Sequence, residues 1–377
     1  MSKRKSIPEA VRLRLWVASA GRCEFKGCNE YVWRNGLTLS EGNFADVAHI
    51  IASSEDGPRG NQDSEDAQVD FKNLMLLCKK CHKEIDDNPE LYSASLLQAW
   101  KKEHENRIEI QTSYTGEIHE STILMFTVNI GDRQVPISLE TVRAAMLPRY
   151  PVDLKGIRIK DSDFDKRVPY DQWMAFAKNK IERKIQRALE EGIDDQVVKH
   201  ISVFAIAPMP LLMYLGKCIG DTVPTDIYQS HRDIKKTDST WSWKDEKELS
   251  YIIRHEKKRD SKTILLKLEI SDFISEDKYH QEEWEDANVY QITIPNPSPH
   301  CMSSRKSLEN FAYSYRDLLN RIQKEHGKDC KIYILPAVPV SVAVQAGRAL
   351  LPNKDPEIYV CEYYGGEIGF KTVLRLN

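Results

Sequence analysis

The sequence predicts a small α+β domain followed by a larger α/β domain that is built from two related units. Two observations lead to this fold class. Two close pairs of cysteines lie in the N-terminal part of the chain, and the segment 201–228 recurs without a gap as the segment 332–359. With 377 residues, of which 41% are hydrophobic, the chain is long enough for two or three domains with sizeable cores.

The cysteine pairs are Cys23 with Cys28 and Cys78 with Cys81, and His82 follows the second pair directly. Four thiols in two close pairs are a usual ligand set of a structural zinc ion. The other cysteines are scattered through apolar segments, which favours a reducing cytoplasm over a secreted disulfide scaffold. Because no stretch approaches the roughly 18 apolar residues of a membrane span, and the first residues lack an apolar signal core, we expect a cytoplasmic protein without membrane contact.

The first domain is expected to begin with a helix that Ser6 and Glu9 cap, with Pro8 in its first turn and Gly21 as its stop. The polar segment 53–70 indicates a loop, and a helix over about 92–110 closes the domain. A connector with one expected strand at 123–130 follows. The expected bounds are 1–110 for the first domain, 111–155 for the connector, and 156–275 and 276–377 for the two repeated units.

Each copy of the repeated segment is typical of a buried strand, a helix that begins at a proline, and another strand. A short strand (156–160 and 289–294) and a long amphipathic helix (173–190 and 304–325) precede each copy. This order, found twice, is the pattern of a parallel α/β sheet. Since ligands of such sheets bind beyond the carboxyl ends of the strands, the two units are expected to share one pseudo-symmetric cleft.

His49, Asn73 and His82 occur in this order around the cysteine pairs. The constellation resembles the HNH (ββα-metal) nucleases. In this interpretation His49 is the general base, His82 binds a catalytic divalent ion, and Asn73 orients the catalytic loop. Many HNH sites carry an aspartate directly before the first histidine, where this chain has Ala48. Asp46 is the nearest acid, and it reaches the ion only if the strand bends, because a regular strand turns it away from His49.

Contacts with DNA are expected from a local patch, since residues 1–110 hold 16 basic and 18 acidic side chains. The candidates for phosphate contacts are Arg59, which lies in the glycine-rich run 57–60, and the neighbouring Lys79 and Lys80. Nothing in the sequence resembles an element that reads bases. We therefore expect little sequence preference.

Taken whole, the chain resembles the HNH–SAVED effector nucleases of bacterial cyclic-oligonucleotide-based anti-phage signalling (CBASS). The likeness rests on the HNH constellation with its glycine-rich run and on the segment YILPAVPVSVAVQAGRALLP, residues 333–352. SAVED domains are fusions of two CARF-like (Rossmann-like) units, in agreement with the repeat. The resemblance therefore implies an α+β zinc-bound ββα-metal domain followed by an α/β SAVED domain.

The same resemblance implies a function. It suggests a metal-dependent endodeoxyribonuclease that cuts double-stranded DNA once a cyclic di- or trinucleotide binds the SAVED cleft. Structural Zn²⁺, a catalytic Mg²⁺ or similar ion, and a homo-oligomer that forms a higher assembly on activation belong to this expectation. Aromatic faces for bases, and hydroxyls, amides or cations for phosphates, give the candidate nucleotide contacts. These are Ser230, Trp241, Trp243, Pro339, Ser341, Arg348 and Tyr363.

Two other classes of protein stay open at this point. A restriction-type HNH endonuclease with a C-terminal half that reads modified DNA would cut without a ligand and would have a basic C-terminal half. A zinc-stabilised DNA-binding regulator with a small-molecule sensor would need neither His49 nor Asn73. The sequence leaves open which cyclic nucleotide, which oligomer and which catalytic metal the cell uses.

Overall fold

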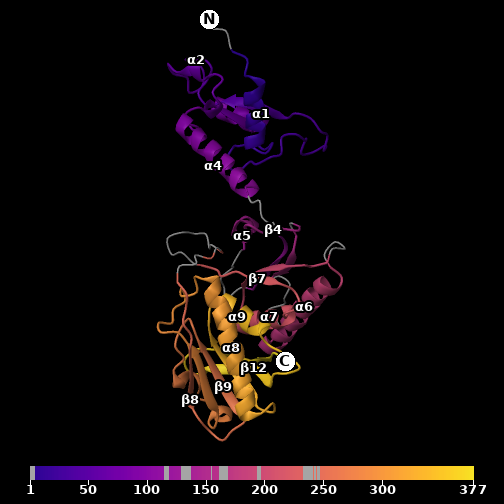
Figure 1. The fold of residues 1–377 in the computed structure, drawn as a ribbon, viewed down its shortest axis with the longest axis vertical. Helices are drawn as coiled ribbons and strands as arrows, with labels where there is room; N and C mark the ends of the chain where they lie inside the picture. Colours follow the sequence, from indigo (N-terminus) through magenta and orange to yellow (C-terminus); the bar gives the residue numbers. More distant parts are fainter. Residues whose placement is uncertain are drawn as a thin grey trace. The chain divides into compact units, whose positions relative to one another are not determined.

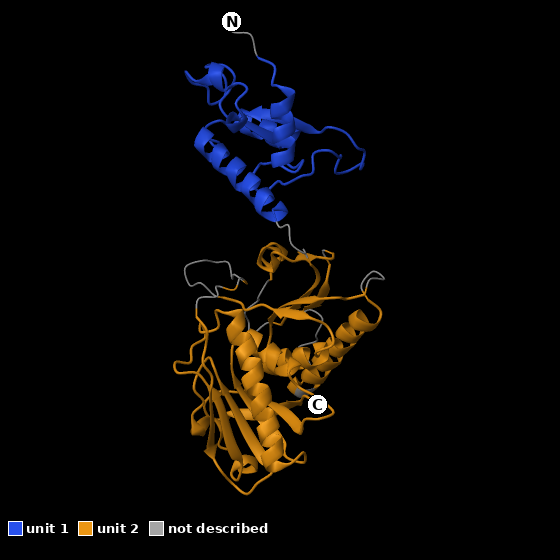
Figure 2. Ribbon diagram, in the orientation of Figure 1, with its two compact units in different colours: residues 1–118 blue, residues 119–377 orange. Residues whose placement is uncertain are grey.

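The computed structural model describes residues 5–113, 119–128, 137–153, 155–160, 169–192, 197–231, 241, 243 and 247–377. The chain divides into two compact units, residues 1–118 and residues 119–377, which are coloured blue and orange in Figure 2. Each unit has its own hydrophobic core. No helix within the described ranges is both long and apolar enough to cross a membrane.

Unit 1 is organised around a two-stranded antiparallel hairpin followed by a helix. His49 lies opposite Leu74 in the hairpin, and Ala45 lies opposite Cys78. The helix α3 begins directly after the second strand, so the order strand, strand, helix agrees with the prediction. The elements of unit 1 are α1 (Glu9–Ala18), β1 (Ala45–His49), α2 (Ser64–Ala67), η1 (Phe71–Asn73), β2 (Leu74–Cys78), α3 (Lys79–Asp87) and α4 (Ala94–Thr112), and Figure 1 labels α1, α2 and α4.

The start of α1 differs from the predicted capping box. The helix begins at Glu9 with Pro8 as its N-cap residue, and no side chain caps it. A proline disfavours the helical conformation of the residue before it, so the helix cannot extend back through Ile7 to Ser6. Its end is as expected: Gly21 has a φ of +64°, and its amide donates to the carbonyl of Trp16. The predicted loop 53–70 also contains the short helix α2.

Unit 2 contains two sheets with the same internal order. Four parallel strands of the first sheet lie in the order β5-β3-β6-β7, and four parallel strands of the second lie in the order β10-β9-β11-β12. Counted along the chain within each sheet, both orders read 2-1-3-4, which is a doubly wound arrangement with its switch point between the first and third strands. The chain therefore contains two Rossmann-like units, as the repeat predicts.

The first sheet consists of β3 (Glu120–Thr127), β4 (Tyr150–Pro151), β5 (Ile157–Lys160), β6 (Ile201–Ile206) and β7 (Thr225–Ile227), and its helices are α5 (Leu139–Met146), α6 (Tyr170–Glu190) and α7 (Met209–Ile219). The second sheet consists of β8 (Ile252–Lys257), β9 (Thr263–Glu269), β10 (Asn288–Thr293), β11 (Lys331–Ala337), β12 (Glu357–Tyr363) and β13 (Phe370–Arg375), with helices η3 (Glu276–Tyr279), η4 (Glu282–Trp284), α8 (Arg305–His326) and α9 (Val340–Arg348). β8 and β13 are antiparallel edge strands.

The bounds of the repeated units differ from the expected ones. β3, in the predicted connector 111–155, is a central strand of the first sheet, and β8 and β9, assigned to the first unit, lie in the second sheet. The reason is an unequal insertion. Thr122 pairs with Ile201 in one sheet, and Ile264 pairs with Ile332 in the other. Along the chain, β3 and β9, the first strands of the two units, are therefore further apart than β6 and β11, the equivalent strands that follow them. A comparison of the two copies without gaps consequently misses the first strand of each unit.

The two units of the repeat are joined by their equivalent helices α7 and α9, which pack against each other near the middle of Figure 1. A Cβ atom added to Gly216 would lie 2.0 Å from the carbonyl oxygen of Val344, and one added to Gly347 would lie 1.8 Å from that of Met213. Gly216 and Gly347 are equivalent in the repeat, and so are Met213 and Val344. The contact is therefore pseudo-two-fold symmetric, and both glycines are required because the backbones touch.

Candidate functional site

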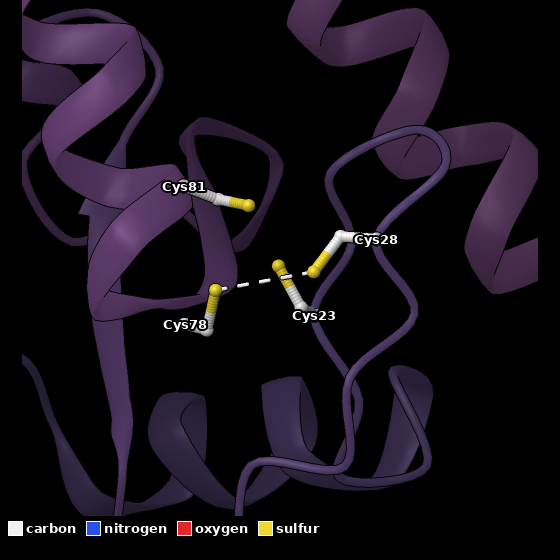
Figure 3. Close-up of side chains that lie close together, drawn as sticks. All are labelled: Cys23, Cys28, Cys78 and Cys81. Carbon is white, nitrogen blue, oxygen red and sulfur yellow. Dashed lines mark hydrogen bonds between the residues drawn. The ribbon is translucent and has the colours of Figure 1, made fainter. Parts of the chain in front are cut away.

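Four cysteines gather at one end of the hairpin in unit 1, and Figure 3 shows their thiols directed toward one another. Cys78 ends β2, Cys81 lies in the first turn of α3, and Cys23 and Cys28 come from the segment after α1. All four sulfur atoms lie within 4.8 Å of one another, and the Sγ atoms of Cys28 and Cys78 are 3.9 Å apart. The structure thus brings together the two pairs that the sequence singled out.

This donor set fits a structural zinc ion. Four sulfurs at about 2.3 Å from one zinc would be roughly 3.8 Å from each other, close to the observed spacing. Burial raises the pKa of the Cys23 thiol to about 12, and it also raises the pKa of Cys81, with further contributions from the neighbouring thiols. A bound cation reverses this effect, because it stabilises the thiolates that burial and mutual repulsion disfavour.

His82 lies on α3 between two carboxylates. Its Nδ1 is 3.1 Å from Oδ2 of Asp46 on β1, and its Nε2 is 3.3 Å from Oδ2 of Asp86, one turn further along α3. The side chains of all three are partly exposed. Asp46 thus reaches His82 directly, across the strand–helix junction, from a strand without a register shift. That Asp46 binds an ion beside His49 stays a prediction. An imidazole and a carboxylate within hydrogen-bond distance are a nitrogen and an oxygen ligand of the kind that divalent ions use.

His49 and Asn73 hold the segment that links β1 to β2. The Nε2 atom of His49 lies 3.0 Å from the backbone carbonyl of Gln68. The buried amide of Asn73 accepts from the backbone amide of Ile51 at 2.8 Å and donates to the carbonyls of Ile51 and Ala67 at 2.9 and 3.1 Å. Asn73 therefore ties the segment after β1 to the residues before β2, and its role in catalysis stays a prediction.

Arg59 does not face solvent as a phosphate donor would, which corrects the expectation for this residue. Its Nε and Nη1 donate to the carbonyls of Ile50 and Ile85, both at 2.6 Å, and its Nη2 lies 3.0 Å from Asp86. The side chain is only 5% exposed. The glycine-rich run allows the close turn of this loop, since a Cβ on Gly60 would lie 2.2 Å from the backbone carbonyl oxygen of Glu55. Arg59 therefore ties the loop to α3.

Lys79 and Lys80, the other candidates for DNA contact, are exposed in the first turn of α3. They are neighbours of the cysteines and lie on the same helix as His82. This is a small basic surface in a unit that is otherwise slightly acidic.

In unit 2, side chains from both halves meet at the carboxyl ends of the strands. Pro339 caps the N-terminus of α9, where the backbone amide and the hydroxyl of Ser341 donate to Oε1 of Gln229, which follows β7, at 3.2 and 2.7 Å. The guanidinium of Arg305, at the N-terminus of α8, lies 5.4 Å from the ring centre of Tyr228. The second half therefore contributes to the edge of the first sheet.

The predicted nucleotide contacts near β7 differ in exposure. Trp241 is 1% exposed and packs edge-on against Phe204 at 5.3 Å, so it belongs to the core. Trp243 is half-buried, and its ring centre lies 6.4 Å from that of His231. The hydroxyl of Ser230 is buried without a hydrogen bond to a described residue.

Two other predicted contacts lie elsewhere. Arg348 is at the opposite end of α9 from Ser341, where its guanidinium donates to the carbonyls of Gly220 and Val223 at 2.9 and 3.4 Å. It joins the two helices at the far end of the strands. Tyr363 lies at the carboxyl end of β12, 43% exposed, with its ring centre 5.3 Å from that of Phe370.

Several residues of this edge were not predicted from the sequence, namely Tyr170, Gln229, Arg305 and Glu362. Tyr170 begins α6, and its hydroxyl donates to Oε2 of Glu362. The repeat carries one signal that could have found part of this set, because Glu362 occupies the position equivalent to His231. No pattern in the sequence indicates that the helix N-termini of one half meet the strand ends of the other.

The fold and these sites define a protein that joins a ββα unit with a cluster of four cysteines to a duplicated Rossmann-like domain. A family model described as "SMODS-associated and fused to various effectors sensor domain" (SAVED) matches residues 181–376, which is just over half of the chain. The chain therefore belongs to the SAVED family. No curated protein matches the chain.

Among solved structures, the chain is similar to the Cap4 SAVED/CARF-domain containing receptor of Acinetobacter baumannii. The form with the cyclic trinucleotide 2'3'3'-cAAA matches with 12% identity and a TM-score of 0.43, over 84% of this chain and 66% of that chain. The form with 3'3'3'-cAAA matches with 13% identity and a TM-score of 0.43, over 85% and 68%. The Moraxella osloensis Cap4 receptor matches with 10% identity and a TM-score of 0.41, over 84% and 66%. The chain thus spans about two thirds of the length of these receptors.

Proposed function

We propose that this chain is a metal-dependent DNA endonuclease that a cyclic di- or trinucleotide switches on in anti-phage defence. Unit 2 receives the nucleotide, and unit 1 cuts double-stranded DNA with little sequence preference. The observation that carries the nuclease proposal is the contact between Asp46 and His82 beside a zinc-fitting cysteine cluster. The strand–strand–helix order and a histidine paired with a carboxylate support an ion site of the HNH kind, in which Asp46 takes the role of the aspartate that Ala48 replaces. A non-catalytic zinc regulator would have no use for such a pair.

The residues of unit 1 divide the chemistry between them. The four cysteines hold a structural zinc, and His82 with Asp46 holds Mg²⁺ or a similar ion. Such an ion neutralises the charge of the phosphate and of the departing oxygen. His49 is the general base. Because a carbonyl only accepts, the contact with Gln68 requires a proton on Nε2, which leaves the lone pair of the neutral ring on Nδ1. Asn73 keeps this segment in place.

Contact with the DNA backbone falls to Lys79 and Lys80, since the guanidinium of Arg59 is already occupied. Two lysines give a weak grip on a polyanion, and unit 1 is acidic overall. Two or more copies on one duplex gain effective concentration, and each copy cuts one strand. We therefore place the switch in a change of assembly that the nucleotide favours.

Two observations support the proposal that unit 2 binds the nucleotide: membership of the SAVED family and the side chains that meet at the carboxyl edges of its sheets. The family description itself names a sensor fused to effectors. In this chain the carboxyl ends of both doubly wound sheets receive side chains from the other half, as the contact between Ser341 and Gln229 illustrates. Ligands of doubly wound sheets bind beyond this edge, so one nucleotide shared by both halves is the arrangement that follows.

The direct test incubates the purified full chain with linear double-stranded DNA, Mg²⁺ and a panel of cyclic di- and trinucleotides. We expect cleavage only when one of these nucleotides is present. His49→Ala should lose about 10²–10⁴-fold in cleavage rate while it keeps its zinc content and nucleotide affinity. Cleavage at the full rate without nucleotide would support a restriction-type enzyme instead. A complete lack of cleavage together with nucleotide binding would support a regulator.

A further inference from the structure

The two repeats carry unlike side chains at equivalent positions of their last strands. Glu362 at the end of β12 corresponds to His231 after β7 when the two copies are aligned without a gap. Each position lies at the carboxyl end of a parallel strand. A pseudo-symmetric edge with an acidic group in one half and an imidazole in the other is suited to a ligand whose two ends differ.

Glu362 points toward the helices of the first half. Side chains alternate along β12, so Ile358 and Val360 face the main core and Cys361 packs in the cluster on the other face. Glu362 therefore lies on the same face as Ile358 and Val360, where the hydroxyl of Tyr170 on α6 donates to its Oε2. A carboxylate accepts at about four lone-pair positions, so this contact uses only part of its capacity.

Aromatic rings surround this carboxyl group. The ring of Tyr170 stacks on Trp173 at 5.6 Å, and Tyr364 meets Tyr170 edge-on at 5.8 Å. Tyr170 and Tyr364 are both 39% exposed. Flat aromatic faces beside a hydrogen-bond acceptor are the combination that binds a nucleobase, because stacking holds the ring and the acceptor reads its edge.

We propose that Glu362 is the residue that selects a guanine base in the cyclic nucleotide, an inference that rests on the proposed function. Guanine presents two neighbouring donors, N1–H and N2–H, which match the two oxygens of a carboxylate. Adenine presents an acceptor at N1 beside its N6 donor, so one carboxylate oxygen would face a lone pair. The half that carries His231 has no carboxylate at the equivalent position, and it reads the other base differently.

The burial of Glu362 predicts that the preference for guanine depends on pH, which a purely structural role of this residue would not produce. Burial raises the pKa of this carboxyl to about 7. The groups that face it are Tyr170 from α6, Tyr364 from its own strand end and Lys371, which lies opposite Glu362 on β13. The tyrosines supply no charge near neutral pH, and the positive charge of the exposed Lys371 does not offset the effect of burial. A protonated carboxyl keeps one donor and one acceptor, as glutamine does. The preference for guanine should therefore strengthen as the pH rises from 6 to 8.

The test is calorimetry on the full chain with cyclic di-GMP, cyclic GMP–AMP, cyclic di-AMP and cyclic triadenylate. The wild-type chain should bind a guanine-containing ligand about 10- to 100-fold more tightly than its adenine counterpart. Glu362→Gln should reduce or reverse this ratio and remove its pH dependence. The isosteric amide is neutral at a site where burial disfavours charge, so the variant should fold. Glu357→Gln, at the other end of β12, is the matched control, since Glu357 also accepts from a tyrosine hydroxyl.

The outcomes separate the two proposals. If cyclic nucleotides bind but Glu362→Gln leaves the ratio of affinities and its pH dependence unchanged, the inference is wrong and the proposed function stands. If the wild-type chain binds the adenine ligands more tightly, Glu362 is not a guanine reader. If none of the four nucleotides binds, the proposed function fails, and the inference fails with it. Tyr170→Phe provides a second check: it should lower the preference for guanine, because it removes the hydrogen bond that positions the carboxyl group of Glu362.

Discussion

Substitution of Gly347 by alanine tests the packing of α7 on α9 that joins the two halves of unit 2. The new Cβ would lie 1.8 Å from the carbonyl oxygen of Met213 and 2.9 Å from the amide nitrogen of Lys217. Ordinary contacts begin near 3.5 Å, so the helices must separate by about 1.7 Å. The obstacle is backbone, which no change of rotamer can remove.

The magnitude follows from two opposing effects. Overpacking of a tight interior costs about 1–3 kcal/mol, and a backbone obstacle places this site at the upper end. Alanine gains about 1 kcal/mol over glycine inside a helix. We therefore expect a net loss of about 2 kcal/mol. For a domain of this size, such a loss lowers the melting temperature by about 4–8 °C.

Gly216→Ala provides the coupled measurement, because its Cβ would lie 2.0 Å from the carbonyl oxygen of Val344 across the same helix crossing. Once the helices have separated for one alanine, the second costs less, so the double variant should lose clearly less than the sum of the two single losses. The assay is differential scanning calorimetry of the full chain. Gly366→Ala is the control, since no atom lies within 4 Å of the added Cβ and its φ is not positive.

A melting temperature for Gly347→Ala equal to or above that of the wild-type chain would show that the helices do not touch as described. Losses that add fully in the double variant would show that the two glycines do not belong to one crossing.

Three further predictions concern the two units. Cys78→Ser should remove one bound zinc, measured by atomic emission, and should lower the melting temperature of unit 1 but not that of unit 2. The reason is that zinc binding contributes on the order of 10 kcal/mol to the folding of small zinc domains. A variant with full zinc content and an unchanged melting temperature would contradict the cysteine site. In urea unfolding, Glu362→Gln should be more stable than the wild-type chain above pH 7, and the difference in stability should narrow toward pH 4.5. Burial raises the pKa of Glu362 from 4.5 to about 7. The stability that the neutral carboxyl contributes is therefore present below pH 4.5 and is lost as the pH rises through 7. An equal difference at both ends of this range would show that the carboxyl is not buried. The activating nucleotide should raise the particle mass in analytical ultracentrifugation before DNA is cut, because a ligand shifts an assembly only through its greater affinity for the assembled form; full cleavage by a particle of constant mass would point to a switch within one chain.

Much of the fold was predictable from local signals. The repeat marks β6, α7 and β7 and their partners β11, α9 and β12, because buried parallel strands read as continuous apolar runs and each helix begins beside a proline. The first strands, β3 and β9, escaped the comparison, because an insertion of different length follows each of them. Spacing along the chain reveals duplicated elements only where the connections are equally long.

The candidate sites divide in the same way. The cysteine cluster was predictable because two close pairs of thiols are a usual ligand set of a structural zinc ion. The role of Arg59 was not predictable, because a guanidinium binds a phosphate or backbone carbonyls of its own chain according to the tertiary position of the loop that carries it. Its left-handed φ of +58° and its contacts with Ile50 and Ile85 exist only after α3 has packed on the loop.

Local patterns were enough to define the composition of each unit: the zinc-fitting cysteines, the strand–strand–helix order around them, and the duplicated α/β pattern. Which side chains from distant segments meet was decided by tertiary packing. It brought Asp46 to His82, bound Arg59 to backbone carbonyls, and placed Tyr170 of one half against Glu362 of the other. The physical reason is that periodicity and spacing report the preferences of a segment for burial and for backbone conformation. Contacts between segments depend on how whole elements pack, and here a crossing of two glycines sets that packing.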